Sequence, residues 1–256
     1  MVLPDIAAAV HWVSNADRTT NQHHKGFPDR KPFFIVYFYA MEQHPIVVPY
    51  QARYFTLGTL TAQTRQIWFV LHGYGQLAEY FLKKFNVLED QNIFVVAPEG
   101  LSHFYLENLQ TTGRASDRVG ASWMTKENRL VDIQNYLAYL NAIDQTVGNP
   151  ADLPVTILGF SQGAATASRW AVEGKVKFQR LVLWAGVFPP DMDFHSAHQI
   201  LEHKETCFVY GTSDPFINDS RFAEMNLLSA KLGITPRVIS FEGKHEMDRD
   251  TLLKLS

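Results

Sequence analysis

A serine between two glycines is the strongest chemical signal in the sequence. Gly159-Phe160-Ser161-Gln162-Gly163 fits the pattern G-x-S-x-G and lies between an apolar segment and a segment of small residues. A strand that turns sharply into a helix exposes the serine hydroxyl, and the glycines leave room for the turn. The alternative is a chance Gly-Ser-Gly turn. The strand before and the helix after favour a catalytic nucleophile, Ser161.

A serine nucleophile needs a histidine base and a carboxylate that orients it. When the serine lies on such a strand-to-helix turn, the order along the chain is serine, acid, histidine. Asp214 and His245 each follow an apolar segment in this order. His245 is the only one of the ten histidines that comes after both other residues. Asp214 could also be a turn residue before Pro215, but its place after a strand favours the catalytic role.

Acyl transfer builds negative charge on the carbonyl oxygen, which two backbone N–H groups usually stabilise. Gln162 directly follows the nucleophile at the start of a helix, so its amide is one predicted donor of this oxyanion hole. The glycine-rich turn His72-Gly73-Tyr74-Gly75 follows an early apolar segment, and Tyr74 is predicted to supply the second amide. We expect His72 to stabilise this turn rather than to take part in catalysis.

From Tyr50 onward, apolar segments alternate with segments of helical length, which is typical of an α/β fold with a mostly parallel central sheet and helices on both faces. Residues at the carboxyl edge of such a sheet meet at one site. Residues 99–122 are rich in turn formers and are predicted to be a long loop. The predicted strands are Ala52–Leu57, Ile67–His72, Ile93–Ala97, Val155–Gly159, Arg180–Ala185, Thr206–Tyr210 and Arg237–Phe241. The predicted helices are Leu77–Asp90, Lys126–Val147, Gln162–Glu173, Ser220–Leu232 and Asp248–Leu255.

Several motifs together resemble the phospholipase/carboxylesterase branch of the α/β-hydrolases, which includes acyl-protein thioesterases. They are His72-Gly73, Ala97-Pro98-Glu99-Gly100, Ser122-Trp123, the segment around Ser161, Gly211-Thr212-Ser213-Asp214-Pro215 and Gly243-Lys244-His245. The resemblance implies the α/β-hydrolase fold and a cofactor-independent hydrolase of short- to medium-chain carboxylic esters or thioesters. It also implies that Trp123 and Met124 lie near the acyl pocket, although both could equally be core residues. Gln162-Gly163-Ala164 departs from the double glycine often found there, which leaves the choice of substrate open.

The predicted mechanism is hydrolysis of a small-molecule ester through an acyl-enzyme. His245 takes the proton of Ser161, the amides of Tyr74 and Gln162 bind the oxyanion, and Asp214 orients the imidazole. A thioesterase or a lysophospholipase would use the same three side chains. A binding protein with this fold but without catalysis would be expected to lack one of them, and all three are present.

The composition excludes several other classes of function. The 256 residues carry a formal net charge of -3, which provides no broad cationic surface for nucleic acid. One cysteine, Cys207, allows no internal disulfide, and its apolar neighbours predict a buried thiol. A metal site could be drawn from His195, His198, His203, Asp191 and Asp193, but a solvated helix face explains them more simply. No metal or other cofactor is expected, and a homodimer is left open.

The first forty residues are predicted to be an N-terminal extension outside a catalytic domain of residues 41–256. Residues 1–32 show no sustained helical or strand period, and Met41 is a candidate natural start. The apolar segment Phe33–Met41 has about nine residues, whereas a membrane-spanning helix needs about 20. No signal peptide is recognised near the start. We therefore expect a cytoplasmic protein without stable membrane insertion.

Overall fold

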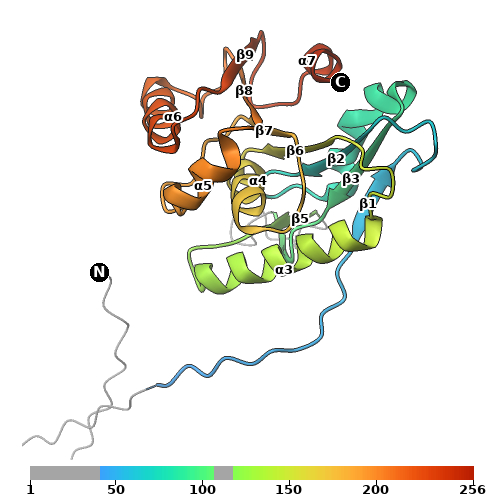
Figure 1. Ribbon diagram of the computed structural model, residues 1–256. Helices are drawn as coiled ribbons and strands as arrows, with labels where there is room; N and C mark the ends of the chain where they lie inside the picture. The colour runs from blue at the N-terminus through green and yellow to red at the C-terminus, as the bar shows by residue number, and fades with distance from the viewer. Residues whose placement is uncertain (1–40, 107–117) are drawn as a thin grey trace, which may run out of the picture. The chain divides into compact units, whose positions relative to one another are not determined.

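A sheet of seven strands forms the centre of the protein (Figure 1). The computed structural model describes residues 41–106 and 118–256. In spatial order the strands are β1 (Tyr54–Leu57), β3 (Ile93–Pro98), β2 (Gln66–Leu71), β6 (Val155–Phe160), β7 (Arg180–Trp184), β8 (Glu205–Gly211) and β9 (Arg237–Phe241). Only β1 runs antiparallel to its neighbour in this sheet. The predicted mostly parallel sheet is therefore confirmed.

The inner strands are apolar along their whole length because both faces of the sheet are covered. In β2, Ile67, Phe69 and Leu71 pack into a core on one face. Trp68 and Val70 alternate with them and pack into a second core on the other face. Successive side chains of a strand point to opposite faces, so an uninterrupted apolar run indicates a strand with two buried faces.

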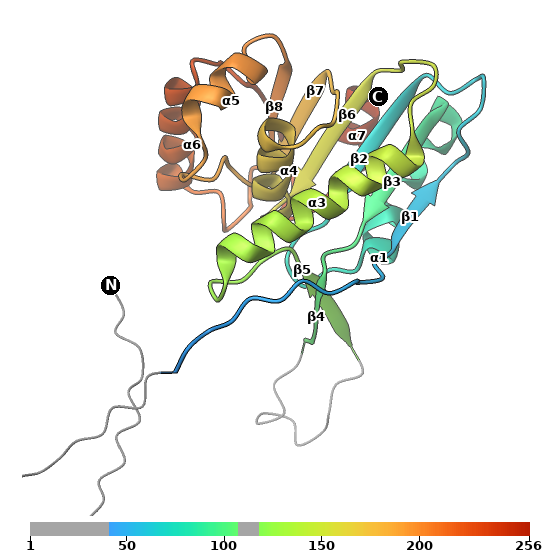
Figure 2. The same cartoon turned by 60° about the horizontal axis from the view of Figure 1, so that its bottom comes forward.

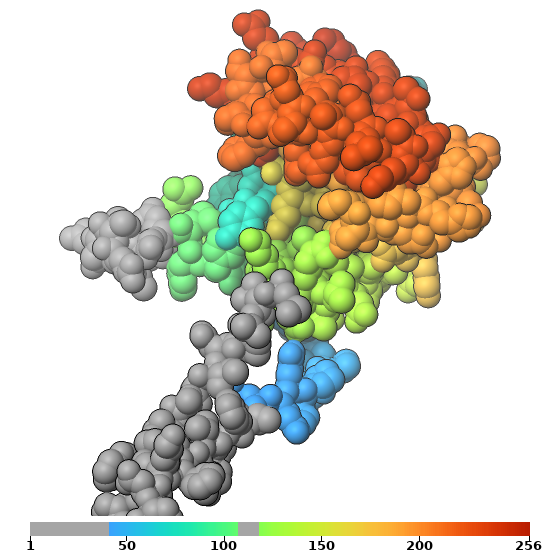
Figure 3. Space-filling view, turned by 90° about the vertical axis from the view of Figure 1, so that its left-hand side faces the viewer, coloured from blue at the N-terminus to red at the C-terminus, as the bar shows by residue number. Residues whose placement is uncertain are grey.

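Helices cover both faces of the sheet, as expected. One core contains side chains of α3 (Arg129–Val147), α4 (Gln162–Glu173), α5 (Phe194–Leu201) and α6 (Asp219–Leu232). The other contains side chains of α1 (Ala78–Leu82), the 3₁₀ helix η1 (Lys83–Gln91) and α7 (Arg249–Leu255). Figure 2 shows α3 in front of the sheet, and Figure 3 shows the surface that α5 and α6 form in orange.

Three local features differ from the sequence-based expectation. The predicted loop of residues 99–122 contains two short antiparallel strands, β4 (Ser102–Tyr105) and β5 (Val119–Ser122). The hairpin adjoins the turn after β2, where the Gly75 N–H donates to the Ala121 carbonyl at 2.9 Å. The predicted helix Leu77–Asp90 divides into α1 and η1, and α5 had not been predicted as an element.

Residues 41–50 have no regular secondary structure, and all of them are exposed. A compact unit begins at Gln51 and extends to Ser256. The predicted extension of residues 1–40, with its apolar segment, lies outside the described residues. None of the helices that the structure describes combines the length and the apolarity needed to span a bilayer.

Candidate functional site

Ser161 lies in a sharp turn between β6 and α4. Its backbone has φ 54° and ψ -115°, a region that residues with side chains rarely occupy. The turn depends on its two glycines. A Cβ atom on Gly159 would lie 2.1 Å from the Gly163 carbonyl oxygen, and one on Gly163 would lie 2.3 Å from the Leu71 carbonyl oxygen. The sequence therefore folds here into the strained turn that G-x-S-x-G predicts.

His245 and Asp214 form a hydrogen-bonded pair at the same edge of the sheet. Asp214 follows β8, His245 follows β9, and the His245 Nδ1 lies 2.7 Å from the Asp214 Oδ2. The Asp214 side chain is fully buried, and its Oδ1 accepts from the Phe216 N–H at 2.8 Å. A carboxylate oxygen can only accept, so the Nδ1 of His245 carries the proton and the Nε2 of the neutral ring is left as a base.

Ser161 and His245 line one hollow of about 330 Å³. The ring of His245 packs between Phe160 and Phe216, with ring centroids 4.9 Å and 4.8 Å apart. The structure thus brings the predicted nucleophile, base and acid to one place. The apolar wall of the hollow had not been predicted and consists of Ala165, Ala185, Val187 and Ile217. A usable signal was present, since Ala185 and Val187 lie within three residues of the end of β7 and Ile217 lies three residues after Asp214.

The two predicted oxyanion donors are backbone amides of turns that meet beside Ser161. Gln162 is the first residue of α4, so its N–H has no partner within the helix. In the other turn, the Gly73 N–H donates to the side-chain oxygen Oε1 of Gln76 at 2.8 Å, and the Gln76 N–H donates to the Gly73 carbonyl. Within the described residues, the Tyr74 N–H makes no hydrogen bond. A Cβ on Gly73 would lie 3.2 Å from the Ser161 Cβ, which places the turn against the nucleophile.

His72 stabilises this turn from inside the core. Its Nδ1 lies 2.8 Å from the Gly73 carbonyl oxygen, and its Nε2 accepts from the Gly100 N–H at 2.9 Å. The Nδ1 must therefore donate, which fixes the neutral tautomer. Burial lowers the pKa of His72 from 6.5 to about 4. The ring joins the turn after β2 to the loop after β3, and the predicted structural role is confirmed.

The Gln162 side chain connects α4 to the end of β5, a contact that the sequence did not indicate. Its Oε1 accepts from the Trp123 N–H at 3.1 Å, and its Nε2 donates to the Met124 carbonyl at 2.9 Å. The Trp123 ring is buried and donates to the His72 carbonyl at 2.8 Å. Met124 is half-buried against the same core. Neither residue lines the hollow at Ser161, so the packing favours their interpretation as core residues, and a pocket role stays a prediction.

A buried glutamate at the end of β3 was also missed as a supporting residue. Glu99 accepts from Arg53 at 2.6 Å and from the Ala78 N–H at 3.0 Å, and it lies 2.9 Å from the His103 Nε2. Burial alone would raise the pKa of Glu99, but these hydrogen bonds outweigh it and hold the pKa below its usual value. Glu99 thereby joins the residue before β1 to the starts of α1 and β4.

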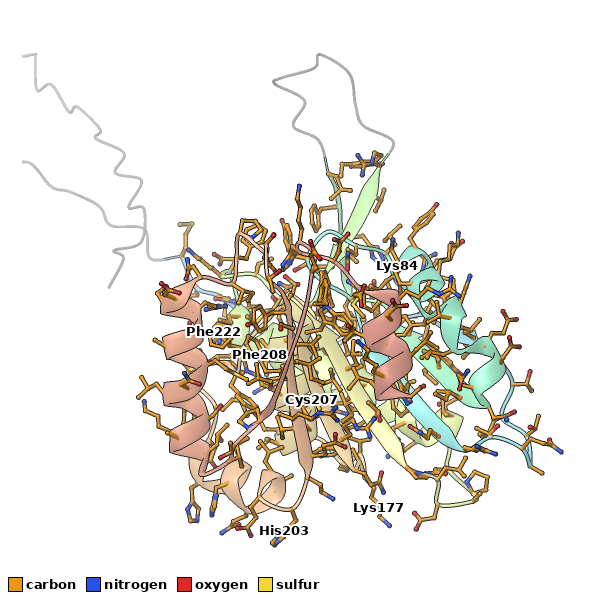
Figure 4. All side chains as sticks on the ribbon, turned by 90° about the horizontal axis from the view of Figure 1, so that it is seen from above. Lys84, Lys177, His203, Cys207, Phe208 and Phe222 are labelled. Carbon is orange, nitrogen blue, oxygen red and sulfur yellow. The ribbon has the colours of Figure 1, made fainter. Side chains whose placement is uncertain are left out.

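The remaining candidates lie away from this site. Cys207, labelled in Figure 4, is buried in β8, and burial raises the pKa of its thiol to about 11. Among the proposed metal ligands, Asp191 pairs with Arg129 and Arg169, and Asp193 caps α5. His195, His198 and His203 contact other groups, and among residues 41–106 and 118–256 no three candidate ligands come together around one point.

Comparisons with known proteins agree with this geometry. A family model described as serine hydrolase (FSH1) matches residues 63–250. A search of curated protein sequences finds no match.

The chain is also similar to solved structures. The acyl-protein thioesterase 2 of Zea mays is 18% identical, with a TM-score of 0.59 over 80% of this chain and 96% of that chain. Esterase PE8 is 19% identical, with a TM-score of 0.58 over the same shares. A Bacillus cereus carboxylesterase is 14% identical, with a TM-score of 0.56 over 80% of this chain and 91% of that chain. These likenesses and the sheet order show the α/β-hydrolase fold.

Proposed function

Because the chain belongs to the serine hydrolase (FSH1) family, we propose that it cleaves carboxylic esters of short- to medium-chain acyl groups through an acyl-enzyme. The observation that carries this proposal is the pair of His245 and buried Asp214, 2.7 Å apart, in a hollow shared with Ser161. With Nδ1 donating to Asp214, the Nε2 of the neutral His245 ring can act as the base for the nucleophile. A neutral base in this position is what activation of a serine hydroxyl requires.

In the proposed mechanism, the Ser161 oxygen attacks the ester carbonyl while the His245 Nε2 takes its proton. The amides of Tyr74 and Gln162 bind the negative oxygen of the tetrahedral intermediate. His245 then gives the proton to the leaving alcohol, and an ester between the acyl group and Ser161 remains. Water, deprotonated by His245, attacks this ester, releases the carboxylic acid and restores the serine.

The limit on acyl length rests on the hollow beside Ser161. Its apolar wall favours a hydrocarbon chain, and its volume of about 330 Å³ is at the small end of the range of ligand pockets. The same residues would also cleave thioesters, since the oxyanion and the acyl-enzyme are identical. A graded series of ester and thioester substrates separates these alternatives.

The test is a comparison of the purified protein with its Ser161→Ala variant on p-nitrophenyl butyrate. We expect the variant to lose at least about a thousandfold in kcat, because the acyl-enzyme cannot form. A fluorophosphonate probe should label the native protein on Ser161 and leave the variant unlabelled. Ser168→Ala is a matched control, because this serine is buried in α4 and donates only to the Ala164 carbonyl. A Ser161→Ala variant with the native rate would refute the proposal.

A further inference from the structure

A second and larger hollow opens on the other side of His245. Its volume is about 870 Å³, and His245 and Phe160 line it together with the oxyanion turn residues Gly75 and Gln76. Because His245 also lines the hollow at Ser161, the two spaces are neighbours at the proposed reaction centre. The larger hollow can hold a substantial part of a substrate, since ligand sites commonly measure about 300–1,000 Å³.

The charges around this hollow are mainly positive. Among the described residues, three cations line it, Arg53, Lys84 and Arg118. They outnumber the carboxylates of Glu246, which also lines it, and of Glu99, which pairs with Arg53. The whole chain carries a net charge of -3, so this excess of cations is not a general property of its surface. A local excess of one sign of charge attracts ligands of the opposite sign.

Lys84 is the cation of this hollow whose charge is best suited to a ligand. Arg53 already pairs with the buried carboxylate of Glu99 at 2.6 Å. The neighbouring Lys83 pairs with Glu79 and lies over the Tyr80 ring. Within the described part of the chain, Lys84 makes no ion pair and no hydrogen bond through its side chain. An ammonium group that lines a hollow without a carboxylate partner is a natural contact for an anion.

From these observations we infer that the substrate is an ester that carries a carboxylate away from the bond to be cleaved, and that Lys84 binds this carboxylate in the larger hollow. The inference rests on the proposed ester hydrolysis and adds the class of substrate. A single ammonium group matches a carboxylate, whereas phosphate sites usually combine several donors such as helix amides and arginines. The apolar lining residues Leu77, Phe81 and Met247 would contact the hydrocarbon part of the substrate.

The test compares esters that differ only in this charge. Mono-p-nitrophenyl adipate carries the carboxylate on the acyl half, and methyl p-nitrophenyl adipate is its neutral counterpart. For the alcohol half, p-carboxyphenyl butyrate is compared with p-carbamoylphenyl butyrate. The measured quantity is the ratio of kcat/KM between the charged and the neutral ester of each pair. The pair with the higher ratio identifies the half of the substrate that occupies the larger hollow.

The variants are Lys84→Met and Lys84→Glu, with Lys177→Met as the matched control. Lys84 and Lys177 are both exposed, and Figure 4 shows them apart from each other. Lys177 precedes β7, so it lies toward the amino end of the parallel strands, opposite the site. The charged-to-neutral ratio cancels any effect of a Lys84 substitution that is common to both esters, and Lys177→Met should leave the rates on the neutral esters within about twofold of the native rates.

We expect Lys84→Met to lower the charged-to-neutral ratio about three- to fivefold, the effect of one partly exposed ion pair. Lys84→Glu should lower it further, because repulsion replaces attraction. The native ratio should also fall as the ionic strength rises from about 0.01 M to about 1 M, since the screening length falls from roughly 30 Å to about 3 Å. Lys177→Met should retain the native ratio.

The outcomes separate this inference from the proposed function. Native hydrolysis of the neutral esters, with the same ratio in the native protein and in both Lys84 variants, would overturn the inference and leave the esterase proposal intact. No hydrolysis of any ester and no labelling of Ser161 would overturn both. A charged-to-neutral ratio that depends on Lys84 for one pair of esters would support the inference.

Discussion

Replacing Asp214 by asparagine should reverse the tautomer of His245 with little change in packing. Asp214 Oδ1 accepts from the Phe216 N–H at 2.8 Å, so the asparagine should keep its carbonyl oxygen in that position. The amide nitrogen then takes the place of Oδ2, 2.7 Å from the His245 Nδ1. An amide nitrogen only donates, so Nδ1 must accept, and the ring proton moves to Nε2. That nitrogen can then no longer take a proton from Ser161.

The expected cost is a loss of about 10⁴ in kcat, the size of effect seen when a triad histidine is held in the wrong tautomer. This factor corresponds to about 5.5 kcal/mol of activation free energy. The free energy of unfolding should change far less, because the asparagine side chain still makes one hydrogen bond to the Phe216 N–H and one to the His245 ring. The side chain is fully buried, so solvent cannot replace either bond.

The assay is kcat on p-nitrophenyl butyrate together with urea unfolding of the same samples. Asp219→Asn is the matched control, because Asp219 is an exposed aspartate five residues along the chain at the start of α6. The control should keep the native kcat. An Asp214→Asn variant that folds and retains more than about a tenth of the native kcat would refute the assignment of Asp214 as the residue that orients His245.

Two further predictions concern the framework of the site. Gly159→Ala should lower the free energy of unfolding by about 1–3 kcal/mol or more and should also reduce kcat. The reason is that the new Cβ would lie 2.1 Å from the Gly163 carbonyl oxygen and displace α4. An unchanged urea midpoint would contradict this prediction. The pKa of His72 falls from 6.5 to about 4 on folding. Between these pH values the unfolded chain therefore binds the proton more readily than the native protein. The free energy of unfolding should decrease by up to about 3 kcal/mol as the pH falls through this range. His72→Gln should show a weaker pH dependence of urea unfolding over this window, and an equal dependence in both proteins would count against a buried neutral ring.

The fold was readable from the sequence wherever burial on both faces leaves an uninterrupted apolar segment. All seven strands of the main sheet were predicted, and β9 and α4 have the predicted bounds. The strands β4 and β5 were missed because they are short, and β4 is mostly exposed, so neither has a clear pattern. The 3₁₀ geometry of η1 was missed because apolar spacings of three and four residues suit both kinds of helix.

The candidate site was predictable to the extent that its residues follow strands in a fixed order. Ser161, Asp214 and His245 were found in this way, and the structure brings them together. The contacts of Gln162 and Glu99 were not, because they depend on which loops become neighbours after folding. Lys84 gave no signal either, since one lysine on an exposed helix resembles any other until the hollow beside it is known.

The strained backbone at Ser161 makes reactivity a reporter of the native state. Its positive φ is held from outside the turn, since the Ser161 N–H donates to the Trp184 carbonyl of the adjacent strand at 2.8 Å. A partly unfolded chain that lost this strand would let the serine relax to an ordinary conformation. The rate of covalent labelling should therefore fall together with the loss of global structure in denaturant, so that a single chemical modification measures the fraction of molecules that are folded.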